Sequence, residues 1–167
     1  SLKVYEIPQA GRAAKGKAII NMLNLEKDEK LQAVLSTKEF EEGKFIVMAT
    51  AYGQVKKTEL TAYANIRSSG LIAIDLEEGD SVISANLTDG KKELLLVTKH
   101  GKAVRFKEDQ ARPMGRATRG VIGIRMEKKD QLISMEVVGA GTMTLAATEN
   151  GYGKRTPVEE YTIHHRG

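Results

Sequence analysis

The sequence contains no cysteine and no tryptophan, and aromatic residues make up only 5% of its 167 positions. Without cysteine the chain can form neither a disulfide framework nor a thiolate metal site. No apolar run approaches the roughly 20 residues that a membrane-spanning helix requires, and the first residues lack the pattern of a secretory signal peptide. We therefore expect a cytoplasmic, globular protein, which fits a hydrophobic content of 41%.

Catalytic and metal-binding patterns are also missing. Gly151-Tyr-Gly-Lys-Arg-Thr156 lacks the spacing of a phosphate-binding loop, so a hairpin is the better interpretation. His164 and His165 are adjacent, and adjacent side chains on a strand point to opposite faces, which favours solvated residues over a metal site. We predict no catalytic residue, no metal site and no cofactor, and hence no enzymatic activity for this chain by itself.

The sequence does contain a repeat of about 50 residues. In residues 45–58, 93–106 and 143–156 an apolar run is followed by Thr-x-x-Gly and then by a run with basic residues. The anchor glycines Gly53, Gly101 and Gly151 are 48 and 50 residues apart. Apolar runs on both sides of a glycine turn predict a β-hairpin, in which glycine takes the positive φ that a tight turn needs.

A second half of the repeat recurs as well. Gly16, Gly70 and Gly120 each open an apolar stretch, and each stretch leads to an aspartate followed by another apolar run. These aspartates are Asp28, Asp80 and Asp130. Because they recur at one place in the repeat, we interpret them as turn residues whose side chains bond the local backbone, and not as catalytic groups.

Four short strands per repeat predict an all-β array of propeller-like blades. The repeats span roughly residues 1–44, 45–92, 93–142 and, incompletely, 143–167, within one domain of residues 1–167. About three four-stranded blades are expected. The chain begins in the middle of a unit and ends in the loop before the next glycine-led strand, so we expect the array to be part of a longer one or to be permuted between blades.

Charge alternates in phase with this repeat. The net charge is only +4, but the stretch from Lys99 to Arg125 holds eight basic residues and two acids, a net charge of +6. Acidic residues gather in the other phase, at residues 26–42 and 75–93. Stacked blades would place the basic loops on one rim and the acids on another surface.

A basic rim of this kind suits the phosphate backbone of duplex DNA, because lysine and arginine release condensed counterions in a manner largely independent of sequence. A curved row of such loops favours bending of the duplex. Scarce aromatic residues disfavour stacking on single strands, and no recognition helix is visible. The alternative is a propeller-like scaffold whose basic loops dock an acidic protein. The candidate DNA-binding residues are Arg12, Lys15, Lys17, Lys56, Lys57, Arg67, Lys102, Arg105, Arg112, Arg116, Arg119, Lys154, Arg155 and Arg166.

Several segments resemble the C-terminal domain of the A subunit of bacterial DNA gyrase. They include Lys3-Val-Tyr-Glu-Ile-Pro8, Gly53-x-Val-Lys-Lys-Thr58 and, most specifically, Asn150-Gly-Tyr-Gly-Lys-Arg-Thr156. The resemblance covers essentially the whole chain. It implies a β-pinwheel, normally of six blades, that wraps double-stranded DNA and favours negative supercoiling. It also implies that cleavage and ATP hydrolysis occur in other domains, with the rest of the gyrase A subunit and the gyrase B subunit as partners. The related domain of topoisomerase IV is the second choice.

The sequence departs from this family at one place. The family's hallmark, a glutamine followed by basic residues and paired glycines, would lie before Ser1, and Arg166-Gly167 resembles a truncated loop of that type. We therefore expect duplex binding from the residues that are present, whereas wrapping depends on the hallmark.

Overall fold

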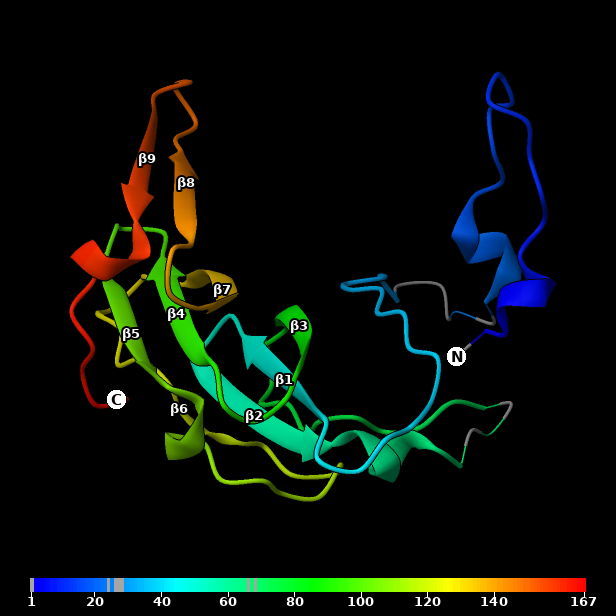
Figure 1. Cartoon of the computed structure of the whole chain (residues 1–167), viewed down its shortest axis with the longest axis horizontal. Coiled ribbons are helices and arrows are strands. Elements are labelled where there is room, and N and C mark those ends of the chain that lie inside the picture. The colour runs from blue at the N-terminus through cyan, green and yellow to red at the C-terminus, as the bar shows by residue number, and fades with distance from the viewer. Residues whose placement is uncertain (1, 24, 26–28, 66, 68) are drawn as a thin grey trace.

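A computed structural model describes residues 2–23, 25, 29–65, 67 and 69–167. The chain forms a crescent, with its N-terminal segment at one horn, the last hairpin at the other, and the central strands along the base (Figure 1). Across the described ranges, no helix has the length and apolar character to cross a membrane.

Short strands dominate the described part of the chain. In order they are β1 (Phe45–Thr50), β2 (Gln54–Glu59), β3 (Val82–Thr88), β4 (Glu93–Thr98), β5 (Ala103–Lys107), β6 (Val121–Ile122), β7 (Leu132–Val138), β8 (Met143–Ala147) and β9 (Gly153–Pro157). The 3-10 helices are η1 (Val4–Glu6), η2 (Ile19–Met22), η3 (Leu60–Tyr63), η4 (Glu108–Gln110) and η5 (Val158–Glu160). The all-β prediction is confirmed.

The three predicted hairpins are present as β1–β2, β4–β5 and β8–β9. Each glycine has positive φ, +81°, +86° and +81° for Gly53, Gly101 and Gly151. Its amide donates to the threonine carbonyl three residues before it, at 2.9, 3.0 and 2.9 Å. The threonine hydroxyl accepts from the amide after the glycine, at 3.2 to 3.3 Å in all three turns. The Thr-x-x-Gly pattern thus encodes a self-capped turn.

The recurring aspartates bond backbone amides, as predicted, but the amides of the hairpin turns lie 28 and 30 residues earlier in the chain and are not local. Oδ1 of Asp80 accepts from the amide of Tyr52 at 2.9 Å, and Oδ1 of Asp130 accepts from the amide of His100 at 3.1 Å. Each of the two also accepts from the amide that follows it. Asp28, the third predicted turn residue, lies outside the described residues.

The sheets show how the blades are joined. Their strand orders are β3-β1-β2-β6, β5-β4-β7 and β8-β9. The fourth strand of the first sheet, β6, comes from the next repeat and pairs with β2 through Gln54↔Ile122 and Val55↔Val121. Repeat 93–142 contains the four predicted strands, β4, β5, β6 and β7, and three strands occur in the described part of residues 45–92. The blade differs from the repeat, however, because β6 completes the sheet of the preceding repeat. In the described part of residues 1–44 only η1 and η2 occur, and no strand.

The core lies between neighbouring blades, because strands β1 and β4 are covered on both faces. Val47, Ala49 and Val55 of one blade pack with Leu94 and other residues of the next in a single buried cluster. Double coverage explains why these strands are continuous apolar runs without alternation. A smaller cluster of Leu95, Val138 and Val158 joins the last hairpin unit to the blade before it.

Candidate nucleic-acid interface

The loop of residues 111–120 follows η4 and runs along the outer side of the crescent from one blade to the preceding one (Figure 1). It is anchored to β2 by a parallel bridge between Pro113 and Lys57 and by the Met114 amide, which donates to the Lys57 carbonyl at 2.9 Å. It then continues into β6. Three predicted DNA-binding residues, Arg112, Arg116 and Arg119, lie on this loop.

Arg116 and Arg166 occupy the same repeat position and make the same contact. Nη1 of Arg116 donates to the carbonyl of Ile72 at 3.3 Å, and Nη1 of Arg166 donates to the carbonyl of Ile122 at 3.0 Å. Donor and acceptor are 44 residues apart in both cases. Both arginines are half-buried, so each guanidinium fixes its own loop while keeping part of its surface accessible.

Arg119 is exposed and forms ion pairs with two acids of the preceding repeat. Its Nε lies 3.0 Å from Asp75, and its Nη1 lies 3.2 Å from Glu77. The hydrogen bond to Asp75 and the charges of both acids raise the pKa of Arg119. The expected separation of basic and acidic surfaces is therefore incomplete here. Exposed ion pairs of this kind contribute little to stability, so a phosphate can replace the carboxylates at small cost.

Lys56, also on the predicted list, is fully buried, with 0% of its surface exposed. Its Nζ donates to the carbonyl of Ala73 at 2.5 Å and to the carbonyl of Arg116. Burial, with the nearby charge of Arg116, lowers the pKa of Lys56 to about 8. These contacts tie β2 to two loops and leave the ammonium group no path to DNA in this structure.

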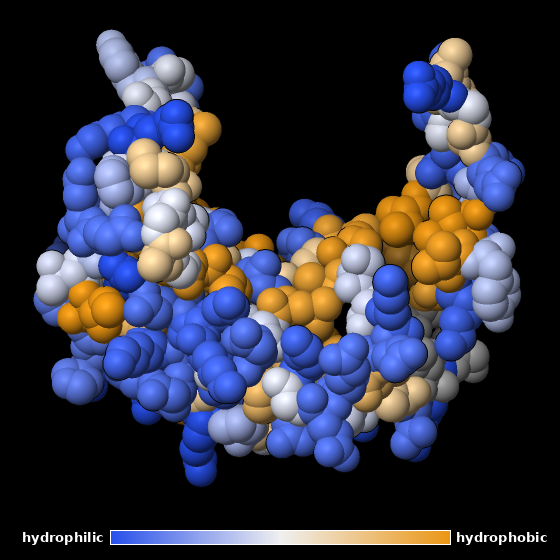
Figure 2. All heavy atoms as spheres, viewed as in Figure 1, coloured by the Kyte–Doolittle hydropathy of each residue, from blue (hydrophilic) through white to orange (hydrophobic). Residues whose placement is uncertain are grey.

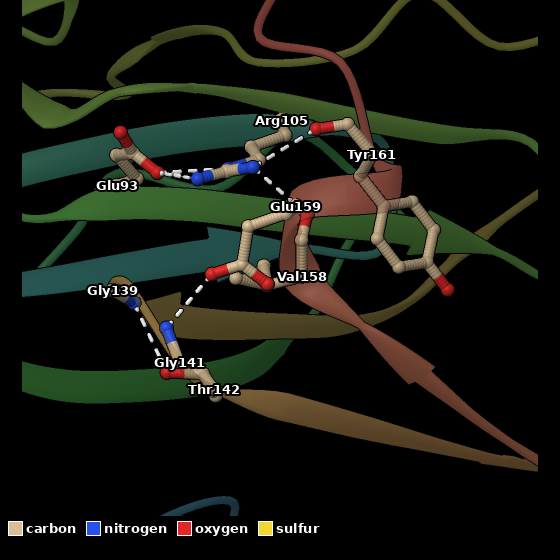
Figure 3. Close-up of polar contacts among 8 residues, drawn as sticks. All are labelled: Glu93, Arg105, Gly139, Gly141, Thr142, Val158, Glu159 and Tyr161. Atoms are coloured by element: carbon tan, nitrogen blue, oxygen red, sulfur yellow. Dashed lines mark hydrogen bonds and ion pairs between the residues drawn. The ribbon is translucent and has the colours of Figure 1, made fainter.

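Lys57 and Arg105 are buried as well, at 3% and 8% exposure. Nζ of Lys57 donates to the carbonyl of Glu108 at 3.0 Å, and burial lowers the pKa of Lys57 although Glu108 and Asp109 raise it. Arg105 pairs with Glu93 through Nε at 2.7 Å and Nη2 at 2.5 Å (Figure 3). Its Nη1 donates to two carbonyls of the segment that follows β9.

The other predicted residues are exposed, namely Arg12, Lys15, Lys17, Arg67, Lys102, Arg112, Lys154 and Arg155. Lys102 donates through Nζ to the carbonyl of Arg125 at 2.7 Å, and Arg125 is itself an exposed cation that the prediction did not include. Arg125 could have been found from the sequence, because it closes the basic stretch that begins at Lys99.

Two of the predicted residues line a hollow of the surface. Hydrophilic side chains predominate along the base and the left flank of the face seen in Figure 2, whereas hydrophobic side chains gather around the inner right part of the U. An open cavity of about 770 Å³ is lined by Arg67 and Arg116 together with Gly70, Ile72 and Glu29. Two arginines from successive repeats thus line one hollow, together with the acidic Glu29.

A family model and the similar proteins of known identity indicate the same family. A family model described as DNA gyrase C-terminal domain, beta-propeller, matches residues 1–38, 44–89, 92–139 and 143–167. The DNA gyrase A subunit of Escherichia coli K12 is 49% identical over 161 residues, which are 96% of this chain and 18% of that protein. The DNA gyrase A subunit of Mycolicibacterium smegmatis is 41% identical over 167 residues, 99% of this chain and 20% of that protein. The chain therefore spans about a fifth of the relatives it matches.

Two solved structures share the fold. The crystal structure of the C-terminal domain of DNA topoisomerase IV aligns with a TM-score of 0.88 at 31% identity, over 98% of this chain and 51% of that one. The structure of the DNA gyrase A C-terminal domain aligns with a TM-score of 0.83 at 26% identity, over 99% of this chain and 53% of that one.

Proposed function

The chain belongs to the family of the DNA gyrase C-terminal domain, and on that premise we propose that it binds duplex DNA without sequence preference along the outer side of the crescent. One observation carries the proposal. Exposed cations recur on the loops at one phase of the repeat, as Arg12, Arg67 and Arg112 illustrate. Contacts of this kind go to phosphates and not to base edges, so they position the protein without reading sequence.

The burial of some predicted residues reduces the set of basic side chains that we propose to contact phosphates. The exposed and half-buried members of the predicted list are the proposed phosphate contacts, with Arg125 added. Lys56, Lys57 and Arg105 are left out of that group, because their side chains are buried and their charged atoms donate to carbonyls inside the protein.

Binding of the 167-residue chain to two duplexes of equal length and unrelated sequence tests this proposal. Fluorescence anisotropy at low salt is expected to give dissociation constants that agree within about twofold, since phosphate contacts supply nearly all of the affinity. No binding to either duplex at low salt would contradict the proposal. It would favour the scaffold alternative, in which the basic loops dock an acidic protein.

We further propose that the bound duplex is bent around the crescent, because the loops follow a curved path (Figure 1). Bending into a wrap changes the linking number of a closed circle that is relaxed by a nicking–closing enzyme while the chain is bound. A shift in linking number supports wrapping. Unchanged topology at saturating protein would limit the chain to docking on DNA.

In the whole enzyme we propose a non-catalytic role for this unit, with the rest of a gyrase A subunit and the gyrase B subunit as partners. The relatives in the comparison are DNA gyrase A subunits, which supports this assignment over the topoisomerase IV alternative. The similarity of the topoisomerase IV domain, at a TM-score of 0.88, keeps that alternative as the second candidate. The linking-number measurement separates the gyrase assignment from the topoisomerase IV assignment. We expect a gyrase-type unit to cause a larger change in linking number than a topoisomerase IV-type unit.

A further inference from the structure

Lys57 and Arg105 occupy equivalent positions in successive repeats. Lys57 is opposite Val47 in the β1–β2 hairpin, and Arg105 is opposite Leu95 in the β4–β5 hairpin. Both side chains are almost fully buried. A buried cation needs hydrogen-bond partners, and in both repeats the backbone carbonyls that accept from the side chain belong to the unit that follows.

Each of the two residues holds the next repeat at two points. The side chain of Lys57 donates to the carbonyl of Glu108, the first residue of η4, and that of Arg105 donates to the carbonyl of Val158, the first residue of η5, at 2.8 Å. The backbone carbonyls accept in return, from the amide of Met114 at 2.9 Å for Lys57 and of His164 at 2.8 Å for Arg105. Parallel bridges to Pro113 and Ile163 complete the two contacts.

The residue of the same hairpin that contacts the buried cation differs between the two repeats, whereas the contacts of the cation with the next repeat are the same. In the first blade the ring of Phe45 lies under the Lys57 ammonium, 5.3 Å from its centroid. In the second blade the repeat-equivalent residue is Glu93, which pairs with Arg105 (Figure 3). A cation–π contact and an ion pair thus serve the same purpose, which is to hold a buried cation pointing at the next 3-10 helix.

From this geometry we infer that Lys57 and Arg105 are positioning residues of an inter-blade joint and not DNA contacts. Each joint holds the segment, 108–114 or 158–164, that leads into a loop carrying proposed phosphate contacts. It therefore sets where Arg112, or Arg166 in the next unit, lies along the crescent. The effect on DNA rests on the proposed function, whereas the joint itself does not.

Amide hydrogen exchange in the 167-residue chain tests the joint without DNA. Lys57→Met is expected to speed exchange of the Met114 amide by about tenfold or more while the His164 amide stays protected, and Arg105→Met is expected to do the reverse. Lys107→Met removes an exposed cation from the same strand as Arg105 and serves as the matched control that changes neither amide. If Arg105→Met fails to fold, Arg105→Lys replaces it. This variant keeps the positive charge but loses the guanidinium group that bonds Glu93 and the next repeat together, so the His164 amide is again expected to exchange faster while the Met114 amide stays protected.

DNA provides the second readout. For Arg105→Met we expect the log–log salt slope of duplex binding to stay at the wild-type value, while energy transfer between dyes at the two ends of a bound duplex falls because the bend is less well defined. A slope smaller by about 0.9 with unchanged protection of His164 would overturn the inference. Failure of the wild-type chain to bind DNA would overturn the proposed function, and the exchange experiment would still decide on the joint.

Discussion

At the scale of single residues, the ionisation of Lys56 is coupled to folding because the side chain is buried and its pKa lies near 8. Below that pH the residue is charged in both states, and the folded chain bears the full cost of a buried ammonium. Between pH 8 and the ordinary lysine value of about 10.4, the folded residue is neutral and the unfolded one still charged, so stability rises with pH.

Lys56→Met should remove this contribution. We expect the free energy of unfolding, measured by urea denaturation from pH 7.5 to 10.5, to rise less steeply with pH in the variant than in the wild type. Lys154→Met, at the exposed equivalent position, is the control and should keep the wild-type profile. Identical profiles for Lys56→Met and the wild type would contradict the burial of this charge.

Asp130 also couples ionisation to folding, but at acid pH and in the opposite sense to Lys56, because here the charged form favours the folded state. Burial acts to raise its pKa, but hydrogen bonds from Thr98 and from the amides of His100 and Gln131 outweigh it and lower the pKa. The stability that this carboxylate provides is present above its ordinary pKa of about 3.9 and is lost as pH falls through the lower folded value.

Replacement of Asp130 separates charge from hydrogen bonding. Asp130→Asn keeps an acceptor for the turn amides, so the urea midpoint should fall less between pH 5 and 2 than in the wild type. Asp130→Ala removes the acceptor and should lower the midpoint at every pH. An unaltered acid profile in the asparagine variant would show that the carboxylate does not support the turn.

The basic residues also show what a sequence can and cannot reveal at this scale. Repeat phase and charge were enough to predict that Arg67 and Arg112 would be exposed on loops. The same criteria included Lys57 and Arg105, because their burial depends on a segment about 50 residues further along the chain. For Arg105 a signal exists in the sequence, because it stands between the apolar Val104 and Phe106 in the middle of a strand. Lys57, between Lys56 and Thr58, has no such signal.

At the scale of elements, the hairpins were predictable because each is encoded locally by Thr-x-x-Gly. The pairing of β6 with β2 was not, since it joins residues far apart in the sequence and a two-residue strand has almost no pattern of its own. The fourth strand of repeat 93–142 therefore belongs to the neighbouring blade.

Gly120 is the position at which this borrowed strand meets β2. Its φ is +111°, and an added Cβ would lie 2.6 Å from the carbonyl oxygen of Val55. Gly120→Ala is expected to destabilise the chain by about 1–3 kcal/mol in urea unfolding, because the strand must move away. Gly115→Ala, in the same loop with no atom within 4 Å of the added Cβ, is the control. Equal stability of the two variants would show that β6 does not pack closely on β2.

At the scale of the whole molecule, the blades form a crescent in which the inner contacts build the core and the outer loops carry the charge. A modest net charge of +4 conceals this division, because acids of one repeat phase offset the cations of the other. On the proposed function, association with DNA depends on the local row of cations, and its strength should fall steeply as salt screens and replaces them.

The salt dependence of duplex affinity is the direct test of whether the outer loops bind the DNA backbone. We compare the wild type, the double variant Arg67→Gln/Arg112→Gln and the control Lys128→Gln, which lies in the phase of the repeat that carries the acids. If the outer loops bind the DNA backbone, the log–log slope of the double variant is smaller in magnitude by about 1.8, or about 0.9 for each phosphate that is no longer neutralised, while the control keeps the wild-type slope. A double variant with the wild-type slope would contradict the claim that these outer loops bind the DNA backbone.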